Sequence, residues 1–261
     1  MTTYKDIGVE THGHVGLIEI QRPPLNFFDI SLINQIADAL EEFDRDIEIR
    51  ASVLAAQGKA FCAGANFNDP NRQDSVATVG GSPTNHLYQE AVRLLRTKKP
   101  IIAAVHGAAI GGGLGVACAA DFRVTCAEAR FAANFTRLGF HPGFGLTVLL
   151  TELVGKNQAE LLFYTGRRIG GEEATRIGLA NVCVPQDQVR AEATKLAAEI
   201  AESAPLAIIS TRQTMRGTLA DRVKAATDHE LKEQTWLRGT EDFKEGVKAT
   251  TERRVANWKG R

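Results

Sequence analysis

The 261-residue sequence contains little sulfur and few large aromatic residues, with four cysteines, two methionines, two tryptophans and three tyrosines. The cysteines are Cys62, Cys118, Cys126 and Cys183. They lie far apart and form no CxxC pair, so the sequence predicts neither a disulfide framework nor a cysteine-based zinc site. We interpret them as free thiols, mostly buried, in a protein of the reducing cytosol.

An excess of charge of one sign is also missing, because 31 Lys and Arg residues balance 31 Asp and Glu residues. This balance argues against a general nucleic-acid binder. The longest apolar runs, such as 101–105, are far shorter than the roughly 20 residues of a membrane-spanning helix. The first residues have no apolar segment typical of a secretory signal. We therefore expect a cytoplasmic protein whose partners include neither nucleic acid nor a membrane.

The chain is long enough to bury a large core, and its hydrophobic pattern predicts an α/β fold. Residues 15–20 form an apolar run bounded by glycine and proline, which is typical of a strand. A helix with apolar residues at helical spacing follows, with Ser31 as its expected N-cap, and 51–55 is a second strand. Strand, helix and strand in this order favour a right-handed crossover. Further strands are expected at 101–105 and 122–125.

Two regions depart from this alternating pattern. Residues 66–84 are rich in asparagine, glycine and proline, which predicts a surface loop or lid. From about residue 186 the pattern is helical nearly to the end. We therefore divide the chain into an α/β core at 1–200 and a helical segment at 201–261. Helices are expected at 85–97, 187–202, from 205, at 219–237 and at 242–255.

Two glycine-rich turns follow strands and carry the strongest functional signal. The sequence IGGGLG at 110–115 has neither the spacing of a dinucleotide site nor a P-loop lysine. It is either a tight turn that permits close packing, or a helix N-terminus whose N–H groups face a developing negative charge. The segment KAFCAGAN at 59–66 offers a second backbone donor. Two such donors form an oxyanion hole, and each contributes about 10²–10³ in rate.

Several motifs together resemble the crotonase superfamily, the enoyl-CoA hydratase/isomerase family. The resemblance covers about residues 10–258. Its strongest parts are GKAFCAGA at 58–65, KPIIAAVHGAAIGGG at 99–113 and AAD at 119–121. Weaker matches are LG at 138–139, PGFG at 142–145, TGR at 165–167, GL at 178–179 and FKEG at 243–246.

The resemblance implies a spiral of ββα units with a C-terminal helical segment that forms homotrimers, which commonly pair into hexamers. It also implies an acyl-CoA substrate, with coenzyme A as part of the substrate and no other cofactor. The oxyanion donors would be the backbone N–H groups of Ala65 and Gly112. Substrate-binding residues would be Ala63, Gly64, Asn66, Phe67, Asn68, Gly111, Gly115 and Phe135. No metal is expected, because no His, Asp and Glu cluster has ligand spacing.

The chain departs from the family pattern at both positions where a hydratase carries a glutamate. Those positions hold Gly115 and Phe135, and neither residue transfers a proton. A related dehalogenase uses an aspartate where this chain has Gly143. The remaining candidate proton carrier is His141, in a loop that borders the family's reaction centre, although it is equally a histidine that caps a turn.

Two functions therefore stay open at this point. The first is an enzyme that forms a thioester enolate but does not hydrate, and that performs hydrolysis, decarboxylation or carbon–carbon cleavage instead. The second is a protein that binds acyl-CoA without catalysis. A set of phenylalanines near the expected pocket indicates an apolar or cyclic acyl group, namely Phe27, Phe28, Phe67, Phe135, Phe140 and Phe144.

Overall fold

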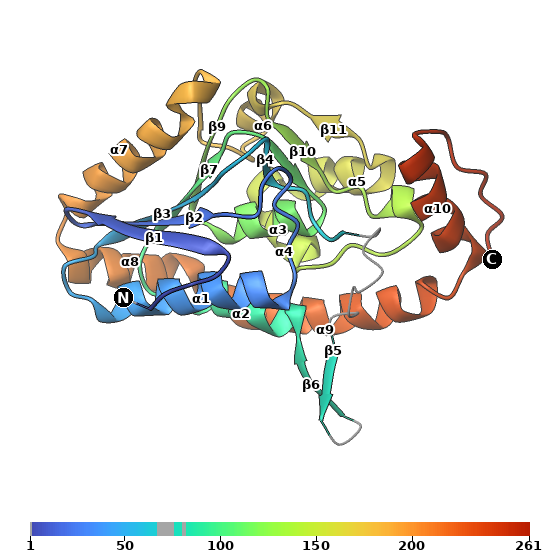
Figure 1. Ribbon diagram of the computed structural model, residues 1–261, viewed down its shortest axis with the longest axis horizontal. Coiled ribbons are helices and arrows are strands. Elements are labelled where there is room, and N and C mark those ends of the chain that lie inside the picture. The colour runs from blue at the N-terminus through green and yellow to red at the C-terminus, as the bar shows by residue number, and fades with distance from the viewer. Residues whose placement is uncertain (1, 67–75, 80–81) are drawn as a thin grey trace.

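A six-stranded sheet forms the centre of the molecule in the computed structural model, which describes residues 2–66, 76–79 and 82–261 (Figure 1). Its first two strands are antiparallel, and every later neighbouring pair is parallel. β3 and β7 are buried along their whole length, as expected of parallel strands covered on both faces. The strand order is β1 (Ile7–His12), β2 (Val15–Ile20), β3 (Ala51–Ala56), β7 (Ile101–Val105), β9 (Phe122–Thr125) and β12 (Val182–Cys183).

A second, four-stranded sheet consists of strands of only two or three residues. The sequence pattern did not predict it, because a three-residue strand is too short to show an alternating hydrophobic period. β4 and β10 both pair in parallel with β8, and β11 pairs antiparallel with β10. The strand order is β11 (Arg168–Ile169), β10 (Arg130–Ala132), β8 (Ala108–Ile110) and β4 (Ala60–Cys62).

Helices cover the sheets and form the C-terminal part of the chain. α7 packs across β3, β7 and β9, while α1 packs on α2 and α2 on α9 (Figure 1). The expected helix at 219–237 is confirmed, and those from 187, 205 and 242 are confirmed to within a few residues. The helices are α1 (Ile30–Arg45), α2 (Leu87–Arg96), α3 (Gly112–Ala119), α4 (Leu146–Val154), α5 (Lys156–Thr165), α6 (Gly171–Arg176), α7 (Val189–Ala201), α8 (Pro205–Arg216), α9 (Leu219–Leu237) and α10 (Glu241–Glu252), with short 3₁₀ turns η1 (Thr136–Leu138) and η2 (Gln186–Gln188).

The N-cap expected for α1 was wrong by two residues. Asp29 is the cap, and its Oδ1 accepts a hydrogen bond of 2.9 Å from the amide of Leu32, while Ser31 lies inside the first turn. Aspartate and serine cap helices about equally well. The apolar residues of the helix begin at Leu32, and the sequence pattern therefore favoured Ser31, which is the capping residue nearer to Leu32.

The loop expected over 66–84 was also wrong in part. β5 (Val76–Val79) and β6 (Ser82–His86) pair antiparallel and project from the body of the molecule next to α2 (Figure 1). Proline and asparagine are poor strand formers, so the composition hid this pair. Residues 67–75 and 80–81 of the expected loop lie outside the described residues. The next helix begins at Leu87 rather than at residue 85.

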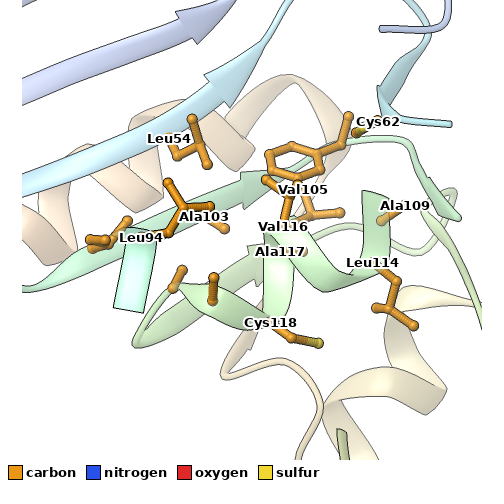
Figure 2. Packing of buried hydrophobic residues seen from close by; sticks show 14 of the residues in the cluster. Leu54, Cys62, Leu94, Ala103, Val105, Ala109, Leu114, Val116, Ala117 and Cys118 are labelled. Atoms are coloured by element: carbon orange, nitrogen blue, oxygen red, sulfur yellow. The ribbon is translucent and has the colours of Figure 1, made fainter. Parts of the chain in front are cut away.

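Part of the hydrophobic core fills the space between the large sheet and α3. Leu54 of β3 and Ala103 and Val105 of β7 face Val116 and Ala117 of α3 (Figure 2). The four cysteines are free thiols, as predicted, and three of them are buried. Burial raises the pKa of Cys62 to about 12 and that of Cys118 to about 11, so these thiols stay protonated and unreactive at neutral pH.

Asp121 connects the α/β core to the C-terminal helices. Its carboxylate accepts hydrogen bonds from the amide of Ile101 at 2.8 Å, from Nε of Arg212 at 3.0 Å and from Nε of Arg216 at 2.9 Å. Burial lowers the pKa of Arg216, and Asp121 acts against this shift by stabilising the charged form. The two arginines of α8 and the strand β7 therefore share one largely buried carboxylate.

We expect Asp121→Ala to lower the free energy of unfolding by about 3–5 kcal/mol, because it leaves two largely buried arginines without their carboxylate. Asp221→Ala is the matched control. It removes the exposed partner of Arg96, at 3.4 Å, and is expected to cost at most about 1 kcal/mol. Urea denaturation of both variants measures the difference. Equal losses would show that the Asp121 pairing contributes no more than a surface ion pair.

Candidate functional site

The two glycine-rich turns meet at one edge of the four-stranded sheet. β4 and β8 are parallel neighbours, with Ala60 opposite Ala108 and Cys62 opposite Ala109. Because parallel strands end on the same side of a sheet, the segments that follow them emerge together. The segment 63–66 leaves β4, and Gly111 and Gly112 leave β8 to begin α3. The fold thus joins two motifs that are about fifty residues apart in the chain.

Glycine is required where these two segments touch. Gly64 has a φ of +83°, and a Cβ on it would lie 2.7 Å from the carbonyl oxygen of Ile110 and 3.8 Å from the amide nitrogen of Gly112. A Cβ on Gly113 would overlap the carbonyl oxygen of Cys62. The turns are therefore glycine-rich because two backbones pack directly on each other, and this close contact also brings their amides together.

Two backbone N–H groups are placed to act as donors. Gly112 is the first residue of α3, so its amide has no carbonyl partner inside the helix and lies at the positive end of the helix dipole. In the described part of the chain, the amide of Ala65 donates to no carbonyl. Its neighbours are held in place, because the amide of Ala63 bonds to Leu25 O and that of Phe28 to Gly64 O, both at 3.0 Å.

A cavity of about 340 Å³ opens at this edge of the sheet. Among the predicted site residues, the structure brings Ala63, Gly64, Ala65, Asn66, Gly111, Gly112 and Phe135 into its wall. Gly115 and His141 do not line it. Phe67 and Asn68 lie outside the described residues.

Several aromatic rings line the cavity wall. Phe28 packs on Phe144 with ring centroids 5.7 Å apart, and a Cβ on Gly112 would overlap the Phe28 ring. On the other side, Phe135 packs edge-on against Phe140 at 5.5 Å, and Phe140 packs against Phe243 at 5.4 Å. The phenylalanines singled out in the sequence thus lie around the cavity, as far as they are described.

Two polar residues at the cavity, Gln234 and Arg238, were missed in the sequence. The hydroxyl of Tyr88 on α2 donates to Oε1 of Gln234 on α9 at 2.8 Å, and Nε2 of Gln234 donates to the carbonyl of His141 at 2.9 Å. Arg238 follows Gln234 by one helical turn and also lines the cavity. Burial raises the pKa of Tyr88, so its hydroxyl stays protonated. The only sequence signal that could have identified Gln234 and Arg238 is their four-residue spacing, which places them on one face of a helix.

Gly115 lies behind the cavity wall, against Phe144. A Cβ on Gly115 would be 2.5 Å from Cδ1 of the Phe144 ring and 2.8 Å from its Cβ. Phe144 is buried and has a φ of +63°, a conformation that costs energy for a residue with a side chain. The aromatic ring therefore fills the space that any side chain at position 115 would need.

His141 faces a different cavity, on the other side of the loop 139–145. Its Nδ1 lies 2.8 Å from the carbonyl oxygen of Pro142, and its ring packs edge-on against His229 at 5.9 Å. Nearby, the buried carboxylate of Glu230 accepts hydrogen bonds from the amide of Gly145 at 2.8 Å and the hydroxyl of Thr147 at 2.6 Å. Burial raises the pKa of Glu230, although these donors act in the opposite direction. The structure thus does not bring His141 together with the oxyanion residues.

Comparison with known proteins agrees with this geometry. The sequence profile of the enoyl-CoA hydratase/isomerase family matches residues 10–261. The chain belongs to this family. It is 35% identical to a probable enoyl-CoA hydratase of Rhizobium meliloti, over 99% of this chain and 100% of that protein. It is 32% identical to the short-chain-enoyl-CoA hydratase of Clostridium acetobutylicum, over 94% of each chain.

Solved structures of the enoyl-CoA hydratase/isomerase family confirm the expected α/β fold. An enoyl-CoA hydratase/isomerase from Pseudoalteromonas atlantica matches with a TM-score of 0.86 and 30% identity, over 98% of this chain and 100% of that chain. A carnitinyl-CoA hydratase from Mycobacterium avium matches with a TM-score of 0.84 and 32% identity, over 99% and 100%. The chain is thus an acyl-CoA enzyme of this family.

The described residues contain neither a membrane-spanning helix nor a cluster of metal ligands. None of their helices is both long enough and apolar enough to span a membrane. Their His, Cys, Asp and Glu side chains form no group of three that could bind a metal ion.

We expect Gly115→Glu to lower the free energy of unfolding by about 3 kcal/mol or more, because the new side chain overlaps a buried ring and buries a carboxylate. Phe144→Gly removes that ring and also relieves the positive φ. The free energy of unfolding of the double variant should therefore fall by at least about 1 kcal/mol less than the two single variants predict when their effects are added.

The control pairs Gly115→Glu with Phe43→Gly, which removes a buried ring that packs on Gly16 instead. Its two losses should add. Urea denaturation of the three single and two double variants measures both double-mutant cycles, one with Phe144→Gly and one with Phe43→Gly. Additive losses in the Phe144 cycle would contradict the assignment of the space at position 115 to the Phe144 ring.

Proposed function

We propose that this protein stabilises the enolate of an acyl-CoA thioester with the backbone amides of Ala65 and Gly112. The observation that carries the proposal is their arrangement, since both amides lie at the ends of adjacent parallel strands in the wall of one cavity. A thioester oxygen that gains negative charge would be stabilised by two such donors and by the dipole of α3. Coenzyme A enters as part of the substrate, and no other cofactor is needed for this step.

The remaining predicted binding residues fit this proposal to different degrees. Ala63, Gly64, Asn66 and Gly111 lie beside the donors, where a thioester would pass. Phe135 lines the cavity, whereas Gly115 acts through the space that it leaves to Phe144. The roles of Phe67 and Asn68 stay predictions.

We propose further that the reaction is not a standard hydration. Hydration needs groups that transfer protons to and from water, and the family positions for two glutamates hold Gly115 and Phe135. Among the described residues, the cavity wall contains no Asp, Glu or His. Decarboxylation fits this wall better, because loss of CO2 forms the enolate without a group that activates water. Hydrolysis and carbon–carbon cleavage stay alternatives that would each need such a group from outside the described wall. His141 stays a predicted proton carrier, and it acts only if the loop 139–145 changes its arrangement.

The absence of carboxylates from the described cavity wall also favours a second candidate function. In this alternative the protein binds acyl-CoA without turning it over. Tight binding of acyl-CoA, together with no product from enoyl, β-keto or malonyl-type thioesters, would identify it.

We propose a cytoplasmic homotrimer or hexamer in which residues 201–261 form the assembly segment and residues 1–200 form the core. The C-terminal segment supports this proposal because it leaves large apolar side chains exposed in the single chain. These side chains are Leu206, Met215, Trp236, Val255 and Trp258.

The first test follows the ultraviolet absorbance of crotonyl-CoA mixed with the purified protein. We expect hydration to be about 10⁴-fold or more slower than in a hydratase with two glutamates, because each proton-transfer group contributes about 10²–10⁴. The Clostridium acetobutylicum hydratase, assayed in the same buffer, is the positive control. Loss of the conjugated thioester at the control's rate would contradict the exclusion of hydration.

The second test substitutes an oxyanion residue. Gly112→Ala adds a methyl group against Phe28 and shifts the amide, so turnover of any thioester substrate should fall by about 10²–10³. Gly16→Ala is the matched control, since its methyl group meets the Phe43 ring in the same way but away from the cavity. Both variants should lose similar stability, and only Gly112→Ala should lose turnover. Equal turnover in the two folded variants would refute the oxyanion assignment.

A further inference from the structure

The loop 139–145 contributes residues to both cavities, and helix α9 binds its main chain at two points. The carboxylate of Glu230 accepts a hydrogen bond from the amide of Gly145 at 2.8 Å. Nε2 of Gln234 donates to the carbonyl oxygen of His141 at 2.9 Å. Both side chains of α9 are almost completely buried, and their four-residue spacing places them on one face of the helix. The C-terminal part of the chain thus fixes this loop.

Tyr88 of α2 meets the same loop. Its hydroxyl donates to Oε1 of Gln234 at 2.8 Å, and its ring packs edge-on against Phe144 with centroids 6.5 Å apart. Gly143 lies directly against this pair, because a Cβ there would overlap the Tyr88 hydroxyl and lie 2.5 Å from Nε2 of Gln234. Tyr88 and Gln234 therefore fill the space beside position 143, and the loop has no room to move toward them.

Phe144 connects the loop to the oxyanion residues. Its ring is buried against Gly115 of α3 and packs on Phe28 with centroids 5.7 Å apart. Phe28 in turn occupies the place where Gly112 would carry a Cβ. The first turn of α3, which presents the Gly112 amide, therefore rests on two aromatic rings. The loop sets the position of one of these rings.

We propose that Gln234 and Tyr88 are positioning residues for the oxyanion hole. Their hydrogen bonds hold the loop 139–145 so that Phe144 and Phe28 keep the amide of Gly112 directed at the thioester oxygen. This assignment rests on the function proposed above. An oxyanion hole is effective because its donors are in place before charge develops. Loss of the bonds that hold the loop should therefore weaken the polarisation of a thioester that still binds.

The ultraviolet spectrum of bound 2,4-hexadienoyl-CoA measures this polarisation. Donors that stabilise negative charge on the carbonyl oxygen of this conjugated thioester shift its absorbance maximum to longer wavelength. The wild-type protein at saturating concentration should produce this red shift, and Gly112→Ala should remove most of it. Gln234→Leu removes the hydrogen bonds to the Tyr88 hydroxyl and the His141 carbonyl, and it should lose about half or more of the shift. Tyr88→Phe removes only the hydroxyl and should lose a smaller part.

Thr125→Val is the matched control. It also deletes a buried side-chain donor to a main-chain carbonyl, that of Val105 at 2.9 Å, and Thr125 does not line the cavity. This variant should keep the full red shift. Equal losses of the shift in Thr125→Val and Gln234→Leu would overturn the proposal, since they would report lower stability alone. A full shift in Gln234→Leu would overturn it as well.

The double variant Tyr88→Phe/Gln234→Leu separates positioning from stability. No tyrosine hydroxyl is left unpaired beside the leucine, so urea denaturation should show it at least as stable as Gln234→Leu. The loop still lacks its bond from position 234, and the red shift should stay reduced. Recovery of the shift together with the stability would contradict the positioning role. A wild-type protein that binds the probe without any red shift would instead contradict the oxyanion function itself, which distinguishes the two failures.

Discussion

In the four-stranded sheet, β4 and β8 run parallel, and the backbone that leaves each strand turns toward the same cavity. The proposed chemistry depends on this pairing, because the two donors are main-chain amides that no side-chain rotation can bring together. Gly64 and Gly113 let the two backbones touch, and the buried aromatic and aliphatic core fixes the strands behind them. A local backbone contact thus becomes a preorganised site for negative charge.

Aromatic side chains fill the space around this backbone site. Phe144 occupies the volume that a side chain at Gly115 would need, and Phe135 supplies an aromatic ring to the wall. A cavity built this way is apolar near the oxyanion donors, and an apolar surrounding strengthens the electrostatic effect of each donor. The same surrounding disfavours reactions that must move protons through water.

The C-terminal helices contribute to the site as well as to packing. Gln234 of α9 and Arg238, which caps that helix, line the cavity, and Glu230 of α9 accepts hydrogen bonds from the amides of Gly145 and Thr147 at the start of α4. Asp121 fixes α8 to the core through two arginines. The boundary near residue 200 therefore remains a prediction about chain organisation, since residues on both sides of it form one cavity wall.

The sequence by itself determined the α/β core, the helices of the C-terminal half and the glycine-rich turns, because hydrophobic periodicity and glycine spacing are local properties. It did not reveal the four-stranded sheet, whose strands are too short for a pattern, nor Asp29 rather than Ser31 as the cap of α1. Only the tertiary structure showed that His141 faces a second cavity and that Phe144 fills the space beside Gly115. It also brought Tyr88, Gln234 and Arg238 to the first cavity, because contacts between α2 and α9 join segments about 146 positions apart.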